Sequence, residues 1–279
     1  MTNTPYRYRP FLFYLLAFAA TWAFWIPAAQ LGSSDVALAL MLCGLCSPAV
    51  IAVGFVTTSG SRPLRRDFLQ KMFSFGRVRW GSVVAAVALF LVVAGLSLAT
   101  SLLFGQPTSQ FAFTEGFSFS ISGASALATI VVASVIEEVA WRGYGEDAIA
   151  QRCTWFVESL WFGATWGLWH LPLFWVEGSY QAGLAELGWP YALNFLVSVV
   201  FLGFITTWVY AASERSMLAS MVFHLFVNTC QEKIAFTPEA KIIETFFVAL
   251  AAALVVATHR ELFFGRGHIG RLPEYRGCD

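Results

Sequence analysis

The chain has 279 residues, of which 58% are apolar and only 12% are charged. An ordinary soluble protein has about 45–50% apolar and about 25% charged residues, so a soluble domain of this composition would have to expose a largely apolar surface. The composition excludes a disordered chain, a collagen, a coiled coil and a nucleic-acid-binding protein. The sequence therefore predicts an all-α polytopic membrane protein, which we treat as a single transmembrane domain over residues 1–279.

Eight apolar segments follow one another along the chain. Most have the ~20 residues that a helix needs to cross a bilayer, and the first seven contain no Asp, Glu, Lys or Arg. The last is shorter and carries Glu244 near its start. We expect about eight transmembrane helices, or seven if the last segment does not span the membrane. The segments are residues 11–31, 36–57, 80–104, 116–136, 159–176, 187–213, 216–231 and about 242–258.

Basic residues are distributed unevenly between the connecting loops. If the N-terminus is cytoplasmic, fifteen Lys and Arg residues fall in the even-numbered loops and the two tails, and only Lys233 and Lys241 fall on the other side. Because Lys- and Arg-rich loops stay in the cytoplasm, we predict a multi-pass protein of the cell membrane with both termini cytoplasmic. Its basic loop 58–79 makes membrane lipids an expected partner.

Ionisable side chains in or beside the predicted spans are few. Each is a candidate functional group, because placing one in hydrocarbon costs roughly 2.5–3.5 kcal/mol. At 1.5 Å per residue, the candidates on the fourth, fifth and seventh spans come to similar depths, so we expect a polar site buried among these three spans. With their immediate neighbours, these residues are Glu137, Glu138, Arg142, Trp166, His170, His224 and Asn228.

Helical spacing relates these residues to one another. His224 and Asn228 are four residues apart and share one helix face, while Glu138 precedes Arg142 by four residues, which favours an ion pair. Glu137 is turned by about 100° from Glu138 and therefore points elsewhere. A carboxylate, two histidines and an amide in one layer suit acyl hydrolysis, in which a base activates water and donors hold the developing oxyanion.

The order of the polar motifs resembles a known family of proteases. The resemblance is to the CAAX prenyl protease and bacteriocin-processing family, which comprises type II CAAX endopeptidases and Abi-like intramembrane proteases, and it covers residues 134–230. It implies hydrolysis of a peptide bond in a membrane-associated peptide or protein, and it leaves open whether that substrate is prenylated. The motifs that carry it are Glu137-Glu138-x-x-x-Arg142, Trp166-x-x-x-His170 and His224-x-x-x-Asn228.

The resemblance implies a catalytic role for four of these residues. Glu137, with His170, would polarise a water, and His224 with Asn228 would stabilise the oxyanion. Zinc stays open, because Glu137, His170 and His224 would match the carboxylate and two histidines of known catalytic zinc sites. Asn228 is a poor zinc ligand and a natural oxyanion donor, which favours a mechanism without a cofactor. Three residues are expected to support the site: Glu138, Arg142 and Trp166.

Two departures from the family pattern concern substrate preference. Trp166 stands where the family usually has Phe, and Glu146 and Asp147 stand where it usually has apolar residues.

Asp147 ends a stretch close to an aspartyl-protease Gly-x-Gly-Asp pattern, and Ser125 lies in a run similar to a rhomboid serine motif. Neither signature is complete. We interpret the Cys43-x-x-Cys46 pair as part of a helix-packing surface of small residues.

Two functions without proteolysis stay open on the sequence alone. One is a membrane scaffold or a self-immunity factor against a bacteriocin, which the family also contains, and the intact polar set argues against it. The other is a transporter that uses the buried Glu and His residues as a proton or cation relay. The absence of paired, Gly- or Pro-interrupted spans in matching halves argues against transport.

Overall fold

Five long apolar helices form the frame of the protein. The computed structural model describes residues 6–114, 126–269 and 272, and within them five helices are long and apolar enough to cross a membrane. Each corresponds to a predicted segment, and the weakest of those segments is in fact a helix of 21 residues. The five are α1 (Pro10–Gln30), α2 (Asp35–Thr58), α4 (Trp80–Leu103), α9 (Trp189–Ala212) and α11 (Pro238–Thr258).

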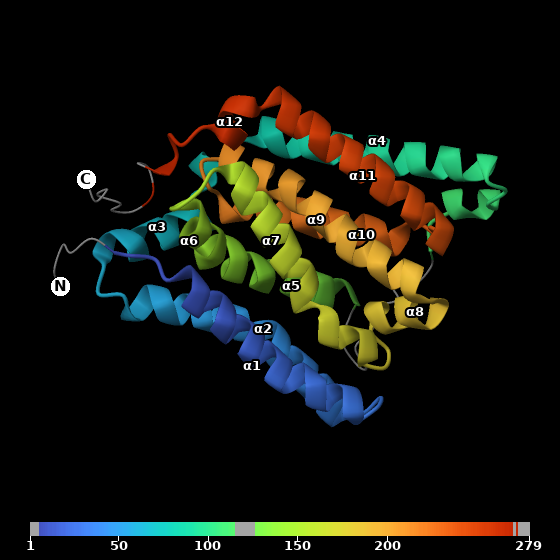
Figure 1. Ribbon diagram of the computed structural model, residues 1–279, viewed down its shortest axis with the longest axis horizontal. Coiled ribbons are helices and arrows are strands. Elements are labelled where there is room, and N and C mark those ends of the chain that lie inside the picture. Colours follow the sequence, from blue (N-terminus) through green and yellow to red (C-terminus); the bar gives the residue numbers. More distant parts are fainter. Residues whose placement is uncertain (1–5, 115–125, 270–271, 273–279) are drawn as a thin grey trace.

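The helices that carry the candidate site residues are shorter. They are α5 (Ala126–Ala140), α7 (Trp155–Trp169) and α10 (Met217–Lys233), with 15, 15 and 17 residues in the described structure. Helices of this length extend about 22–26 Å, less than the ~30 Å of a bilayer core. Residues 116–125 of the predicted fourth span lie outside the described residues. α10 covers nearly the same residues as the predicted seventh segment, 216–231, and α7 and α10 both pack against the long helix α9 (Figure 1).

The predicted fifth span, 159–176, is not one helix. α7 begins earlier, at Trp155, and ends at Trp169, after which η4 (Leu171–Trp175) forms a 3₁₀ turn. Pro172 has no N–H to donate and disfavours the helical conformation in the residue before it, so the α-helix cannot continue. The break leaves His170 as the C-cap of α7. The chain then turns through α8 (Tyr180–Leu187) into α9.

The fourth predicted span continues past its expected end at residue 136. α5 runs to Ala140 and passes through a π-helical turn, η3 (Trp141–Gly145), into α6 (Glu146–Ala150). Single π turns are rare and frequently lie at functional sites. Lys71 on α3 (Arg62–Phe73) donates to the carbonyl oxygens of Arg142 and Gly143 in this turn, at 2.9 and 3.0 Å.

A buried ion network closes the end of the molecule at α6. Asp147 Oδ2 lies 2.6 Å from Lys71 Nζ and 2.5 Å from Arg215 Nη2, and Asp147 Oδ1 accepts a hydrogen bond from Tyr210 at 3.0 Å. Burial by itself raises the pKa of Asp147, but the charges of Arg215 and Lys71 lower it to about 2. The carboxylate that ends the Gly-x-Gly-Asp-like stretch is thus a structural anchor. Ser125 lies outside the described residues.

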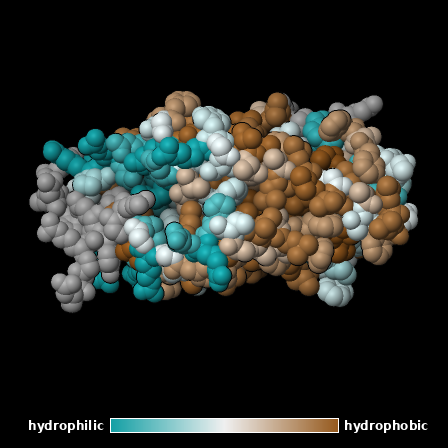
Figure 2. Space-filling model, turned by 90° about the horizontal axis from the view of Figure 1, so that it is seen from above, coloured by the Kyte–Doolittle hydropathy of each residue, from teal (hydrophilic) through white to brown (hydrophobic). Residues whose placement is uncertain are grey.

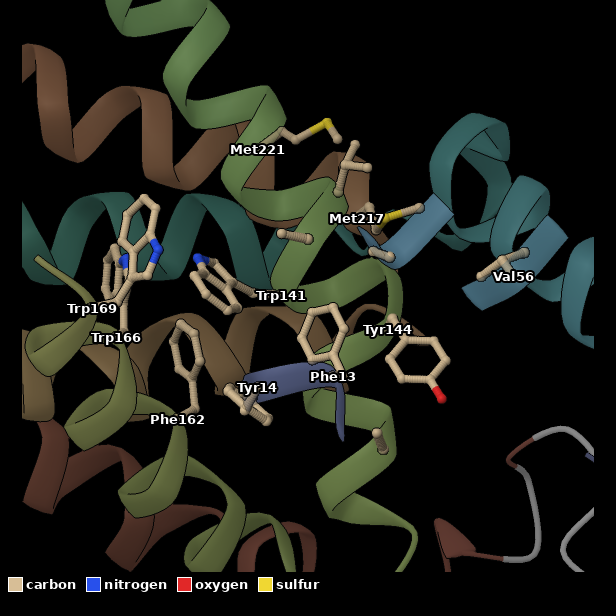
Figure 3. Close-up of a cluster of buried hydrophobic side chains, with 14 of the residues drawn as sticks. Phe13, Tyr14, Val56, Trp141, Tyr144, Phe162, Trp166, Trp169, Met217 and Met221 are labelled. Atoms are coloured by element: carbon tan, nitrogen blue, oxygen red, sulfur yellow. The ribbon is translucent and has the colours of Figure 1, made fainter. Parts of the chain in front are cut away.

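Aromatic and small residues hold the helices together. Trp141 is almost fully buried, and its ring packs against Phe162 and Trp169 of α7 and Tyr14 of α1 (Figure 3). A Cβ at Gly163 would come within 2.7 Å of the α9 backbone, so this glycine permits the close approach of α7 and α9.

The α1–α2 contact uses the small residues that we interpreted as a packing surface. Cys43 and Cys46 are free thiols. A Cβ at Gly44, between them, would lie 2.3 Å from the indole nitrogen of Trp25. The Cys43-x-x-Cys46 stretch therefore serves helix packing in this fold, as the sequence predicts.

Polar and apolar residues separate along the long axis of the molecule. α3, α6 and α12 (Arg260–Phe264) lie at one end and α8 at the other (Figure 1). Figure 2 shows hydrophilic residues gathered toward the first end and a broad hydrophobic region over much of the rest of the visible face. This arrangement is typical of a multi-pass membrane protein. The remaining short elements are η1 (Phe75–Arg77) and η2 (Thr108–Phe111).

Candidate active site

The four predicted catalytic residues line one cavity. Glu137 comes from α5, His170 from the end of α7, and His224 and Asn228 from α10, and together they border a space of about 260 Å³. Glu137, His170 and His224 are buried. Three helices of the fold thus bring these four residues to one cavity.

Trp166 positions the carboxylate of Glu137. Its indole Nε1 donates a hydrogen bond to Glu137 Oε2 at 2.8 Å. The same ring lies beside both imidazoles, with centroid distances of 6.0 Å to His170 and 5.5 Å to His224. A Phe at this position would fill similar space but would donate nothing to Glu137. The departure from the usual aromatic residue therefore adds a contact to the site.

Each histidine is oriented through its Nδ1 atom. His170 Nδ1 lies 2.7 Å from the carbonyl oxygen of Trp166, and His224 Nδ1 lies 2.9 Å from Glu138 Oε1. A carbonyl or carboxylate oxygen only accepts, so Nδ1 of both rings carries the proton. In a neutral ring Nε2 is then an acceptor, and in a doubly protonated ring it is a second donor. Both rings thus keep Nε2 for chemistry.

Glu138 does more than form the predicted ion pair with Arg142. Its Oε1 lies 3.1 Å from Arg142 Nη1, as expected, and the same oxygen also contacts His224 Nδ1. Glu138 therefore links the supporting ion pair to a residue of the cavity. The sequence interpretation missed this contact because 86 residues separate Glu138 from His224. In the sequence, the only sign of this contact was that Glu138 is adjacent to Glu137 and is expected at the same depth.

Arg142 lies fully buried beneath the site. Besides Glu138, its guanidinium contacts Glu146 at 2.9 Å and Thr206 at 2.6 Å, and its Cζ lies 4.2 Å from the centre of the Phe162 ring. Glu146, on α6, is thus a second buried acidic partner of Arg142. Arg142 thus connects α5, α6, α7 and α9.

Asn228 presents an amide to the same cavity one helical turn from His224. Its Nδ2 lies 3.4 Å from the hydroxyl oxygen of Ser134 on α5. Since an amide group has two N–H donors, one remains for a ligand after this contact. A doubly protonated His224 and Asn228 can therefore donate toward one oxygen atom from the same helix face.

The geometry does not fit the zinc triad that the sequence left open. Within the described residues, no group of three or more His, Cys, Asp or Glu side chains is arranged to hold a metal ion. We therefore derive no catalytic step through a metal.

The fold and site define a multi-pass helical membrane protein with a polar cavity enclosed by its helices. Residues 119–230 match the family model described as type II CAAX prenyl endopeptidase Rce1-like. The chain is 34% identical over 263 residues to CAAX prenyl protease 2 of Methanococcus maripaludis. The aligned region covers 93% of this chain and 97% of that protein. The chain belongs to the CAAX prenyl protease family, and it is a peptidase of the intramembrane type.

Glu138→Gln is expected to lower kcat for peptide cleavage by on the order of 10²–10⁴, because a neutral amide no longer stabilises the doubly protonated form of His224. The variant should also unfold more easily, since Arg142 loses one of its buried partners. The measurement is kcat per folded molecule, with folding followed by thermal unfolding in detergent. Glu146→Gln is the matched control, because Glu146 contacts Arg142 and not His224. A kcat for Glu138→Gln equal to that of the control would contradict this positioning role.

Proposed function

We propose that this protein cleaves a peptide bond near a prenylated cysteine in a membrane-associated peptide or protein. The observation that carries the proposal is the convergence of Glu137, His170, His224 and Asn228 on one cavity. Apolar walls around these polar groups suit an isoprenoid chain or apolar side chains. The residues of these walls include Trp25, Met41, Leu45, Phe90, Phe195 and Leu202.

In the proposed reaction, Glu137 accepts a proton from a water molecule that also hydrogen-bonds to His170 Nε2. The water oxygen attacks the carbonyl carbon of the scissile bond, and the carbonyl oxygen becomes an oxyanion. His224 Nε2–H and the amide of Asn228 donate to that oxygen. The proton then passes from Glu137 to the leaving nitrogen. The C–N bond breaks, giving a new carboxylate and a free amine.

The test uses the full-length protein purified into liposomes. The substrate is a peptide with an S-farnesylated cysteine followed by three residues, and products are identified by mass spectrometry in H₂¹⁸O. We expect cleavage after the cysteine and one ¹⁸O atom in the new carboxylate. The same peptide without the farnesyl group should be cleaved much more slowly. Absence of cleavage would contradict the proposal, and cleavage without ¹⁸O would exclude direct attack by water.

Activity is expected to survive removal of metal ions. Because no group of three His, Cys, Asp or Glu side chains in the described residues is arranged to hold a metal ion, incubation with 1,10-phenanthroline or EDTA should leave kcat unchanged within about twofold. The check is cleavage of the same peptide before and after chelation and dialysis. Loss of activity that zinc alone restores would make the same residues metal ligands and would refute the water-only mechanism.

We further propose that both termini face the cytoplasm of the cell in whose membrane the protein lies. Support comes from the fifteen-to-two distribution of basic residues and from the position of α3, α6 and α12 at one end (Figure 1). A cysteine-reactive, membrane-impermeant reagent should fail to label a tag cysteine after residue 279 in intact cells and should label it after lysis. Labelling of that tag in intact cells would reverse the orientation.

A further inference from the structure

The cavity has a second polar region, about two to three helical turns from the level of His224. Gln231 and Lys241 also line it, at the end of the molecule where α8 lies. In the described part of the chain, no carboxylate forms an ion pair with Lys241 Nζ. It donates instead to the hydroxyl of Tyr180 at 2.9 Å and lies 4.6 Å from the centre of that ring.

The position of Lys241 is fixed by its neighbours. Asn194 of α9 donates to the backbone carbonyl of Lys241 at 3.2 Å, which ties the start of α11 to α9. Both acidic residues of α11 near Lys241 have other hydrogen-bond partners: Glu239 accepts from the hydroxyl of Tyr191 at 2.9 Å, and Glu244 accepts from Gln231 at 2.8 Å. Lys241 is only partly buried. A cation held in a mostly apolar cavity, with a neutral phenol as its hydrogen-bond partner, is suited to bind an anion.

The distance from the catalytic level can be measured along the helices. Gln231 lies seven residues beyond His224 on α10, which corresponds to about 10 Å at 1.5 Å per residue. Glu244 on α11 is the hydrogen-bond partner of Gln231 and so lies near the same level. Lys241 precedes Glu244 by about one turn, which places it farther from His224, at about 15 Å from the level of that residue. Three or four residues of extended peptide span about 10–14 Å.

We propose that Lys241, supported by Tyr180, binds the C-terminal carboxylate of the substrate and thereby selects bonds three or four residues from a free C-terminus. This inference rests on the proposed function and adds to it the part of the substrate that fixes the cleavage position. Lys241 is a specificity-determining residue in this scheme, since it touches the leaving peptide and none of the reacting atoms.

The experiment compares two forms of the farnesylated peptide, one with a free C-terminal carboxylate and one with a C-terminal amide. For the wild-type protein, the amide should raise KM by about 10- to 100-fold, the effect of losing one hydrogen bond to a charged group, with kcat within about twofold. Lys241→Met should raise KM for the carboxylate form to the value of the amide form and leave the amide form unaffected. Lys241→Arg should restore most of the preference.

Lys233→Met is the matched control. Lys233 is the other basic residue on this side of the predicted topology, but it is not among the residues that line the cavity. This variant should keep the preference for the carboxylate form. Equal KM values for the two wild-type reactions, or an equal effect of Lys241→Met on both peptides, would overturn the inference and leave the proposed function standing. Failure of the wild-type protein to cleave either peptide would instead refute the proposed function.

Discussion

Glu137→Ala should abolish peptide cleavage while the protein remains folded. Glu137 is the only carboxylate of the catalytic layer that we expect to accept the proton of water, since Glu138 is engaged by Arg142 and His224. Loss of a general base of this kind, together with its positioned water, should lower kcat by on the order of 10⁴ or more. The measurement is single-turnover cleavage of the farnesylated peptide, with thermal unfolding as the check on folding.

The same assignment makes a prediction for combined variants. His170→Ala and His224→Ala should each remove most activity, and the double variant of Glu137 and His170 should be hardly slower than either single variant, because residues that act as a unit are not additive. Asn228→Ala should cost less, on the order of 10²–10³, the usual effect of one oxyanion donor. If the losses at Glu137 and His170 multiply, the two residues do not share one water molecule.

Arg142→Met is expected to produce the largest loss of stability. The substitution fills similar volume but leaves Glu138 and Glu146 without the cation that they contact at 3.1 and 2.9 Å. Breaking a buried ion pair by removing one partner typically costs about 3–5 kcal/mol. We expect a matching decrease in the free energy of unfolding, measured by denaturation in mixed micelles, and a low yield of folded protein in membranes.

The matched control is Arg79→Met. Arg79 also pairs with a glutamate, Glu214, but the two side chains are 59% and 52% exposed. An exposed pair contributes about 0–1 kcal/mol, so this variant should unfold almost as the wild type does. Equal effects of the two substitutions would show that Arg142 does not hold α5 to its neighbours through charge. Since Arg142 also contacts Phe162 and Thr206, Arg142→Lys should recover only part of the loss.

Composition and local pattern were enough to predict a protein built of membrane helices, a set of polar residues that line one cavity, and the family that the chain resembles. This was possible because hydrocarbon imposes two strong constraints. A spanning helix must be apolar for about 20 residues, and an ionisable side chain within it must be paired, face a cavity or serve a function. The i,i+4 pair of Glu138 and Arg142 was likewise predictable, since it depends on the geometry of a single helix.

Helix ends and contacts between distant segments depend on how the folded chain packs and could not be predicted from local pattern. The break of α7 at His170 and the π turn at Trp141–Gly145 depend on how the chain packs around the cavity, although Pro172 signals the first. The Glu138–His224 contact and the place of Lys241 in the cavity join residues from different helices. Periodicity along one helix gives the face on which a side chain lies, but not which other helix that face meets, because that choice is made by packing.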